Sequence, residues 1–304
     1  GDFRVQEIFG PEELLALCAS CERSSSHPIA QSIVAAAREK NLPLVQPEVL
    51  EEIPGRGIRG ILGGREILCG DGTLNKFINT VDIDNIPCDV YYYGSGSGND
   101  FFHCVKGDCT PELIEITHLV KKLPTALIKG KEYTFINGIG YGIDGYCCEV
   151  ADKQRANGKT DINYTAIAIL GVLFFYKPCG VTVTVDGVEH RFENAWLAPM
   201  MNGRFYGGGM MPTPEQKRNS DELSVMIFHS AGKLRLLTIF PSLFKGEHVK
   251  HTKYVSVLKG KEITVKYDVP KPLQVDGETI VDVPECTMKA YSKKTQRFNS
   301  DIHN

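Results

Sequence analysis

The amino-terminal part of the chain carries apolar residues at helical spacing. Residues 14–21 repeat leucine, alanine and cysteine along one side, and residues 29–37 repeat isoleucine, valine and alanine three or four positions apart. Pro11, which two glutamates follow, and Pro28 suit the first turns of helices. The pattern predicts two amphipathic helices, the second ending near "NLP" at residues 41–43.

Short apolar runs separated by glycines follow these helices. The stretch "VLEEIPGRGIRGILGGREILCGD", residues 49–71, predicts three strands joined by two glycine turns. Further on, Thr110 is a candidate N-cap, and the apolar residues from Leu113 to Val120 predict a helix that faces inward. The front of the chain is therefore expected to be an α/β domain.

From about residue 128 the pattern becomes alternating and β-rich. An Asp-Gly pair within an alternating run predicts a hairpin. Such runs are "VTVTVDGVEHRF" (181–192), "LSVMIF" (223–228), "EITVKYDV" (262–269) and "LQVDGETIVDV" (273–283). Residues 162–176 are the one helical candidate among them. This pattern predicts a second domain that is mostly antiparallel and β-sandwich-like.

Composition limits the class of protein. The chain has 304 residues, of which 42% are hydrophobic and 23% charged, and this is ordinary for about two globular domains. The net charge of −3 argues against a nucleic-acid partner. Ten scattered cysteines indicate reduced thiols. No apolar run reaches the ~18 residues of a membrane span and no signal peptide is recognisable, so we expect a cytoplasmic protein without a transmembrane segment.

Residues 1–68 carry a first resemblance. The segments "CERSSSHPIAQSIVAAA" and "IPGRGIRGILGGREILCG" resemble the nucleotide-binding domain of heavy-metal P-type ATPases. The resemblance implies that Glu22, His27, Gly55 and Gly57 contact the adenine and ribose of ATP, the glycines allowing close backbone approach. Ser26 stands where that family usually has a glutamate. Taken alone, His27 would favour an ordinary histidine at a helix start over a nucleotide contact.

This resemblance does not extend to transport. No Asp-Lys-Thr-Gly-Thr loop occurs in the sequence, and the later strands of that ATPase domain are missing. The first segment is therefore at most an ATP-binding fragment of such a domain.

Residues 67–304 contain five segments that carry a second and longer resemblance. They are "CGDGTLNKFINTV", "GSGSGNDFF", "YTFINGIGYGIDGYCCEV", "APMMNGRFYGGGMMPTPEQKRNSDELSVMIF" and "LQVDGETI". In this order they resemble soluble bacterial diacylglycerol kinases, a lipid kinase family related to sphingosine kinases. The resemblance implies a two-domain lipid kinase of phospholipid metabolism, with ATP and Mg²⁺ as cofactors.

The matched motifs imply a nucleotide site. Glycine-rich loops before a helix expose backbone N–H groups to phosphates. The residues implied in cofactor binding are Gly70, Asp71, Gly72, Thr73, Ser97, Gly98, Asn99 and Asp100. Two plain glycine turns with side-chain capping are the alternative interpretation.

The resemblance also implies catalytic and metal residues. Glu278 is the implied general base for the acceptor hydroxyl, and Asp71 orients the phosphates through Mg²⁺. The alternative is that Asp276-Gly277 forms a hairpin turn and Glu278 is merely solvated. Asp221 with the carbonyls of Arg218 and Leu223 resembles a structural Mg²⁺ site, against the alternative of a capped turn.

The two resemblances overlap at "ILCG", which indicates a chimera. Cys69 occupies the position of the kinase family's first glycine. We expect an ATPase-like segment at 1–66, the rest of the ATP-binding kinase domain at 67–128 with 289–304 returning to it, and a lipid-substrate domain at 129–288. The expected function is transfer of the γ-phosphate of ATP to diacylglycerol or a related lipid. The alternative is a nucleotide-binding chimera without catalysis.

The resemblance also bears on partners and location. The lipid substrate would be met at a membrane surface, with peripheral attachment to the inner membrane face, and a homodimer is one expected assembly. Six lysines between residues 245 and 266 suit anionic headgroups, and suit a solvated strand face equally well.

Overall fold

The computed structural model describes residues 12–24, 28–53, 57–69, 73–81, 83–86, 89–93, 99–107, 113–159 and 162–292. The chain divides into two compact units. The first contains residues 1–97 and 106–121, and the second contains residues 98–105 and 122–304. The three domain ranges expected from the sequence stay predictions, and most of the segment expected to return at the carboxyl end lies outside the described residues.

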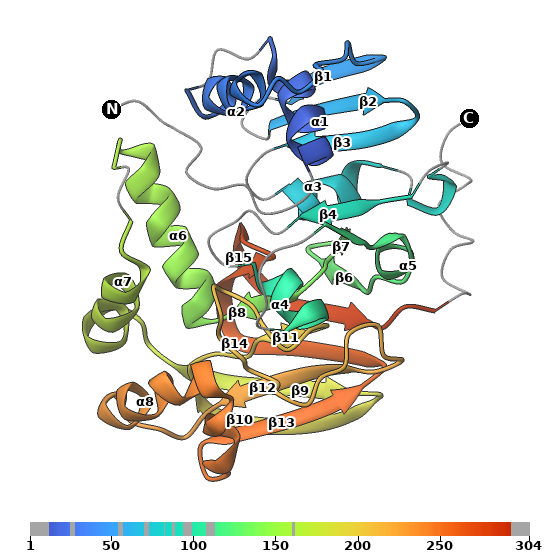
Figure 1. Cartoon of the computed structure of the whole chain (residues 1–304). Coiled ribbons are helices and arrows are strands. Elements are labelled where there is room, and N and C mark those ends of the chain that lie inside the picture. The colour runs from blue at the N-terminus through green and yellow to red at the C-terminus, as the bar shows by residue number, and fades with distance from the viewer. Residues whose placement is uncertain are drawn as a thin grey trace. The chain divides into compact units, whose positions relative to one another are not determined.

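The first unit begins with two helices and an antiparallel three-stranded sheet (Figure 1). These elements are α1 (Glu12–Glu22), α2 (Pro28–Glu39), β1 (Val49–Ile53), β2 (Gly57–Leu62) and β3 (Arg65–Cys69). The sheet order is β1-β2-β3. The two helices and three strands predicted from the hydrophobic pattern are thereby confirmed.

A small core holds the helices together and a glycine lets α1 approach the sheet. Leu15 and Ala19 of α1 pack with Val34 and Ala37 of α2. A Cβ on Gly60 of β2 would overlap Cys21 Sγ, so only glycine leaves space for this contact. Cys21 is fully buried, and burial raises the pKa of its thiol to about 12. The thiol is therefore part of the packing of this unit.

The rest of the first unit differs from one prediction. It contains α3 (Thr73–Thr80), a 3₁₀ turn η1 (Ile83–Asn85), β4 (Tyr91–Tyr93), β5 (Leu113–Glu115) and α5 (Thr117–Val120). The helix expected to run through residues 113–120 is wrong over β5, which pairs antiparallel with β4. A partner strand thus overrides the local helical pattern. The short helix α5 follows Glu115, whose carboxylate accepts the Thr117 N–H at 2.6 Å.

The second unit is built on one antiparallel sheet of ten strands. The strands are β6 (Thr125–Ile128), β7 (Lys131–Thr134), β8 (Gly138–Tyr141), β9 (Cys179–Val185), β10 (Val188–Ala195), β11 (Met200–Met201), β12 (Leu223–Phe228), β13 (Val255–Gly260), β14 (Glu262–Val275) and β15 (Glu278–Lys289). The main path is β13-β12-β11-β8-β14-β15-β6-β7, and β9 joins β10 to β14. The expected fold class, an α/β front followed by a mostly antiparallel β body, is confirmed.

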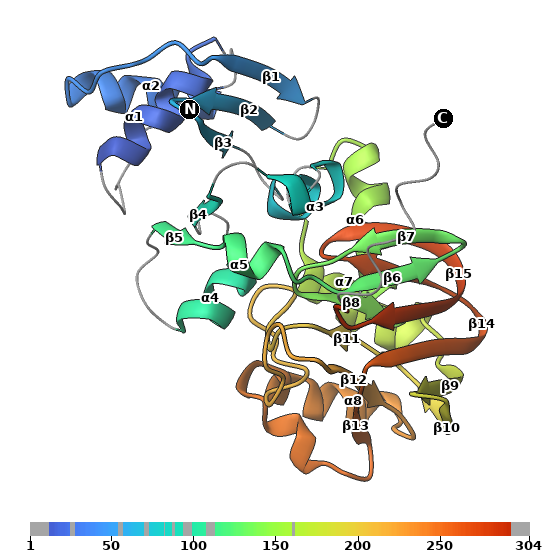
Figure 2. The same cartoon turned by 90° about the vertical axis from the view of Figure 1, so that its right-hand side faces the viewer.

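The long strand β14 changes its partner halfway along. Ile263–Tyr267 pair with β9, whereas Leu273–Val275 pair with β8. The pairing with β15 shifts register between Lys266 and Leu273, where Pro270 and Pro272 lie and cannot donate to the ladder. Residues of both halves of β14 belong to one hydrophobic core, and Figure 2 shows β14 and β15 side by side.

The second unit also contains helices, and residues of most of them share another hydrophobic core with the outer side of β12. They are α6 (Ile143–Ala156), α7 (Tyr164–Leu170), one π-helical turn η2 (Gly171–Phe175), α8 (Lys233–Ile239) and the 3₁₀ turns η3 (Phe240–Lys245) and η4 (Glu247–Lys250). Every residue of β12 is buried, because Val225 and Ile227 face the sheet core while Met226 and Phe228 face the helices. The predicted helix at 162–176 is confirmed as α7 and η2, whereas α6 and α8 were not anticipated.

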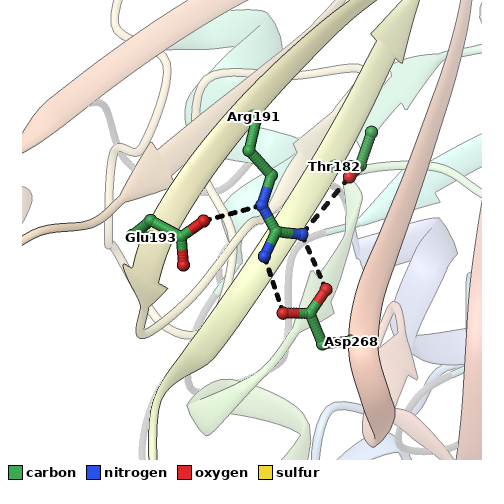
Figure 3. A network of polar contacts seen from close by, with 4 residues as sticks. All are labelled: Thr182, Arg191, Glu193 and Asp268. Carbon is green, nitrogen blue, oxygen red and sulfur yellow. Dashed lines mark hydrogen bonds and ion pairs between the residues drawn. The ribbon is translucent and has the colours of Figure 1, made fainter.

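A polar network ties three neighbouring strands of the second unit at the surface (Figure 3). Arg191 of β10 donates two hydrogen bonds to the Asp268 carboxylate of β14, at 2.6 and 2.7 Å, and one to Glu193 at 2.8 Å. Between them lies Gly180 of β9, where a Cβ would overlap the guanidinium. The guanidinium lowers the pKa of Asp268. This bidentate pair fixes the register of β10, β9 and β14.

In the described ranges, no helix has both the length and the apolar character needed to cross a membrane.

Candidate functional site

Three backbone N–H groups at the start of β8 converge on one carboxylate. Asp276 accepts from Ile136 N at 2.6 Å, Asn137 N at 2.8 Å and Gly138 N at 3.1 Å. Charge-assisted bonds of this kind are stronger than neutral ones. The Asp276 side chain therefore anchors the β14–β15 hairpin to the residues that lead into β8, which belong to a distant part of the chain.

The hairpin itself is a two-residue turn that presents Glu278. Asp276 and Gly277 have φ of 45° and 98°, and Val275 pairs with Glu278 across the turn. Positive φ at both central positions is the geometry for which Asp-Gly is favoured. The Gly277 N–H donates to Gln274 Oε1 at 2.5 Å. The predicted Asp-Gly turn is confirmed, and Glu278, exposed at the start of β15, stays a predicted base.

Arg218 reaches the same segment from the loop before β12. Its guanidinium donates to Ile136 O at 2.5 Å and to Asn137 Oδ1 at 2.6 Å, and it lies 4.7 Å from the centre of the Phe101 ring. A Cβ on Gly203 would lie 2.6 Å from Arg218 Nη2, so a glycine leaves room for the guanidinium. The sequence implied only a metal-binding carbonyl for Arg218, whereas the structure gives its side chain a role in holding residues 136 and 137.

The Gly-Asn-Asp loop and the triple-glycine loop meet. Asp100, the first residue of α4 (Asp100–Lys106), accepts from Gly208 N at 2.8 Å and Gly209 N at 2.7 Å, across 108 and 109 residues of sequence. Residues 207–209 all have positive φ, between 61° and 99°, which disfavours any residue with a Cβ. Burial raises the pKa of Asp100, against the lowering effect of these two bonds.

Two buried polar atoms accompany these contacts. In the part of the chain that the structure describes, Asn99 Oδ1 and Arg218 Nε find no hydrogen-bond partner. Asn99 also has a φ of 44°, an uncommon conformation for a non-glycine residue. Unsatisfied buried polar groups call for an explanation such as a bound ligand or water. The cluster thus has the polar character of a ligand site.

Asp144, in the first turn of α6, adds a carboxylate that the sequence interpretation did not single out. Its Oδ2 accepts from Gln274 Nε2 at 3.1 Å, and Gln274 also holds Gly277 through its other amide atom. A Cβ on Gly140 would overlap the Asp144 carboxylate. The signal available in the sequence was an aspartate that opens a helix directly after glycines in "GIGYGIDG".

Burial raises the pKa of Asp144 to about 6, against the lowering effect of hydrogen bonds from Gln274 and Tyr206. Because the folded-state pKa lies above the ordinary value, the unfolded chain loses this proton first as pH rises. The contribution of Asp144 to stability is therefore present below about pH 4 and is lost as pH rises through about 6. We expect Asp144→Asn to raise the unfolding free energy near neutral pH by up to about 3 kcal/mol and to change it little near pH 4.

Urea unfolding over this pH range measures the effect. Asp152→Asn, which alters an exposed carboxylate of the same helix, is the matched control and should change stability by less than about 0.5 kcal/mol. If Asp144→Asn lowered the unfolding free energy equally at every pH, ionisation of Asp144 would not be what reduces the stability of the parent chain near neutral pH.

The loop predicted to bind metal is well held. Gln216 Nε2 donates to the carbonyls of Lys217 and Glu222, each at 2.9 Å, and Gln216 Oε1 accepts from Ser224 at 2.5 Å. Asp221 is exposed on this loop, and Leu223 begins β12. No cluster of three histidines, cysteines, aspartates or glutamates occurs among the described residues. One carboxylate with carbonyls and water suits a hard cation, so the donor set fits Mg²⁺.

The remaining predicted site residues, except Gly98, belong to the first unit. Thr73 begins α3, Gly57 begins β2, and Glu22 is buried at the end of α1. Since β3 ends at Cys69 and α3 begins at Thr73, a strand and a helix flank the predicted phosphate loop. The other predicted residues lie outside the described ones: His27, Gly55, Gly70, Asp71, Gly72, Ser97 and Gly98.

Comparison with known proteins gives the family. The model of the YegS C-terminal NAD kinase beta sandwich-like domain matches residues 137–292, which is just over half of the chain. The chain therefore belongs to this family. The matched range holds strands β8 to β15 of the β body, Arg218, the triple glycine and the Asp276-Gly277 turn.

Individual relatives reflect both resemblances. The putative lipid kinase YtlR of Bacillus subtilis is 24% identical over 233 residues, 72% of this chain and 74% of that protein. A diacylglycerol kinase of Mycobacterium tuberculosis is 32% identical over 203 residues, 65% of this chain and 64% of that protein. Copper-transporting ATPase 2 of Rhizobium meliloti is 29% identical over 170 residues, 51% of this chain and 20% of that protein. The chain thus resembles lipid kinases over most of its length. Its resemblance to the copper ATPase covers only a small part of that ATPase.

Proposed function

We propose that the chain is an ATP-dependent lipid kinase that phosphorylates a hydroxyl group of diacylglycerol or a related lipid. The observation that carries the proposal is the convergence in the second unit. Contacts made by Asp100, Arg218 and Asp276 link the Gly-Asn-Asp loop, the triple-glycine loop and the Asp-Gly-Glu turn to the neighbourhood of residues 136–138. The same three motifs carry the sequence resemblance to diacylglycerol kinases, and two relatives are named as lipid kinases.

In this proposal Glu278 performs the proton transfer. The oxygen of the acceptor hydroxyl forms a bond to the γ-phosphorus as the bond from that phosphorus to the β,γ-bridging oxygen breaks. The hydroxyl proton passes to the Glu278 carboxylate. Asp276 does not react and instead holds the turn against residues 136–138, so that Glu278 keeps its position at the start of β15.

ATP and Mg²⁺ complete the proposed site. Gly70, Asp71, Gly72 and Thr73 are proposed to bind the phosphates, with Ser97, Gly98, Asn99 and Asp100 as the second nucleotide loop. Asp221 with the carbonyls of Arg218 and Leu223 would hold Mg²⁺ for a structural purpose. A separate Mg²⁺, bound with ATP and oriented through Asp71, would neutralise charge on the phosphates during transfer. We further propose that the protein works peripherally on the inner face of a membrane, while a homodimer stays a prediction.

A second candidate function has its own support. The antiparallel β1-β2-β3 sheet with α1 and α2 coincides with the segment that resembles the ATPase nucleotide-binding domain. Cys69 directly precedes the predicted phosphate loop, where the kinase family has a glycine. In this candidate the chain binds ATP, through Glu22, His27, Gly55 and Gly57, and transfers no phosphate.

One experiment separates the two candidates. The purified chain is incubated with Mg²⁺, ATP labelled in its γ-phosphate and diacylglycerol in mixed micelles, and the extracted lipids are resolved by thin-layer chromatography. A lipid kinase forms labelled phosphatidic acid in an amount that grows with enzyme and time. ATP binding by calorimetry without any labelled lipid would contradict the kinase proposal and support the non-catalytic one.

A further inference from the structure

The second unit exposes an apolar surface beside α6 that its own core does not cover. Leu170 of α7, Phe174 and Phe175 of η2, and Leu234 of α8 are exposed, the last three at 69%, 65% and 76%. Scattered exposed apolar residues are normal, whereas a group of large ones on adjoining elements marks an interaction site. We call Ile169, Leu170, Phe174, Phe175 and Leu234 the apolar patch.

Contacts on the inner side hold the patch together. Ile167, Val172 and Leu236 are buried in one core, so α7, η2 and α8 turn their inner sides to the same cluster. Lys233 Nζ donates to Leu173 O at 2.6 Å and joins α8 to η2. A Cβ on Gly171 would lie 2.8 Å from Tyr146 Cε1, so glycine lets η2 lie close to α6. The patch is therefore a fixed surface with its apolar side chains outward.

The elements that carry the patch hold cations and no carboxylate, whereas α6 beside them carries Glu149 and Asp152, and Glu247 follows Lys245. Residues 162–185 and 229–246 contain Lys177, Lys233, Arg235 and Lys245 and no acidic residue, although the whole chain has a net charge of −3. In the ranges that the structure describes, no salt bridge joins these four cations to a carboxylate. By contrast, Lys250 and Lys259 of the lysine-rich segment lie within 4 Å of glutamates.

We propose that the apolar patch docks the protein on the surface of a membrane that contains anionic lipids. Aromatic and aliphatic side chains with cations around them suit the boundary between headgroups and acyl chains, where the apolar groups enter and the cations meet lipid phosphates. This inference rests on the proposed lipid kinase function, because an acyl lipid acceptor resides in a membrane. Docking needs neither ATP nor catalysis, so it is tested separately.

Flotation with lipid vesicles tests the surface in the absence of ATP. The chain is mixed with vesicles of phosphatidylcholine alone or of phosphatidylcholine with phosphatidylglycerol, and bound protein is measured after centrifugation. We expect binding to the anionic vesicles that weakens with salt. The double variant Phe174→Ser/Phe175→Ser should lose about 100-fold in partition coefficient, since two large apolar side chains no longer leave water. Lys177→Ala should lose about fivefold on anionic vesicles only.

The matched control is Val188→Ser/Val269→Ser. These two valines are exposed at 60% and 47% on β10 and β14, outside the apolar patch, and their replacement should leave partition unchanged. Circular dichroism and urea unfolding verify that both double variants fold as the parent does. Equal loss of binding in the control, or parental binding by the phenylalanine variant, would overturn the proposal.

A fluorescence measurement tests insertion directly. The only tryptophan, Trp196, is 1% exposed and gives a constant background. In Phe174→Trp a second indole replaces an exposed ring, and its emission should shift to shorter wavelength on adding anionic vesicles, because tryptophan enters the headgroup region. Val188→Trp should show no shift. Absence of a shift in Phe174→Trp would contradict docking through this surface.

The outcomes also separate this inference from the kinase proposal. Vesicle binding that depends on the apolar patch, without formation of phosphorylated lipid, would contradict only the kinase proposal. A chain that phosphorylates dispersed short-chain diacylglycerol but does not float contradicts only membrane docking. Self-association that depends on Phe174 and Phe175, without vesicle binding, would make the patch a contact between copies of the chain and overturn the proposal.

Discussion

Asp71→Ala is expected to eliminate phosphorylation of the lipid, whereas His27→Ala is expected to leave it largely unchanged. Asp71 lies in the Gly-Asp-Gly-Thr loop, which resembles the kinase family and precedes α3, and there it would orient the phosphates through Mg²⁺. His27 belongs to the ATPase-like segment. Only one of two nucleotide sites can feed one acceptor, and the Gly-Asp-Gly-Thr loop is the one that comes with the acceptor domain.

The measurement is the initial rate of labelled phosphatidic acid formation at saturating ATP. Thermal unfolding of each variant verifies that it folds. Calorimetric titration with ATP shows whether His27→Ala removes a nucleotide site that takes no part in transfer. Loss of kinase activity in His27→Ala with an intact fold, together with retained activity in Asp71→Ala, would reverse the assignment of the two sites.

Glu278→Gln is expected to lower kcat by roughly 10²- to 10⁴-fold, the usual contribution of a general base. The interaction of the base with the departing proton grows in the transition state, so the loss falls on kcat far more than on the KM for ATP. The hydrogen bonds that Asp276 accepts from Ile136 and Asn137, and the pairing of Val275 with residue 278, do not need the carboxylate of Glu278. The variant should therefore fold normally.

Glu285→Gln is the matched control for this variant. Glu285 is an exposed glutamate of the same strand, 4.0 Å from Lys266, and its replacement should leave both kinetic constants unchanged. A Glu278→Gln enzyme that works at the parental rate would make Glu278 a turn residue only, and Asp71 would then be the next candidate for the base.

The sequence predicted correctly those elements that are specified by one buried face or by one turn. The helices at α1 and α2, the three glycine-linked strands, and the Asp276-Gly277 hairpin all depend on residues close together in the chain. Periodicity and turn chemistry specify such elements locally. The alternating runs identified the antiparallel β body for the same reason, since period-two patterns reflect one buried face.

One error arose where pairing with a distant strand determined the secondary structure. Residues 113–115 carry an apolar pattern that suits a helix, yet they form β5 because Tyr91–Tyr93 pair with them.

The helix α6 was missed although Ile143, Cys147 and Ala151 recur at helical spacing and Lys153 and Arg155 suit its last turn. Its glycine, Gly145, and its two adjacent cysteines hid that period. Asp144 was missed with it.

The chemistry-bearing motifs, their order and the family they resemble follow from the sequence, because glycine, aspartate and asparagine at close spacing mark tight turns and loops by residue type alone. How these motifs come together does not. The bonds from Gly208 and Gly209 to Asp100, and the clamp of Asp276 on residues 136–138, join positions more than a hundred residues apart. Local pattern carries no information about such contacts. The Asp276 bonds depend on the pairing of β14 with β8, and the Asp100 bonds depend on the approach of α4 to the triple-glycine loop.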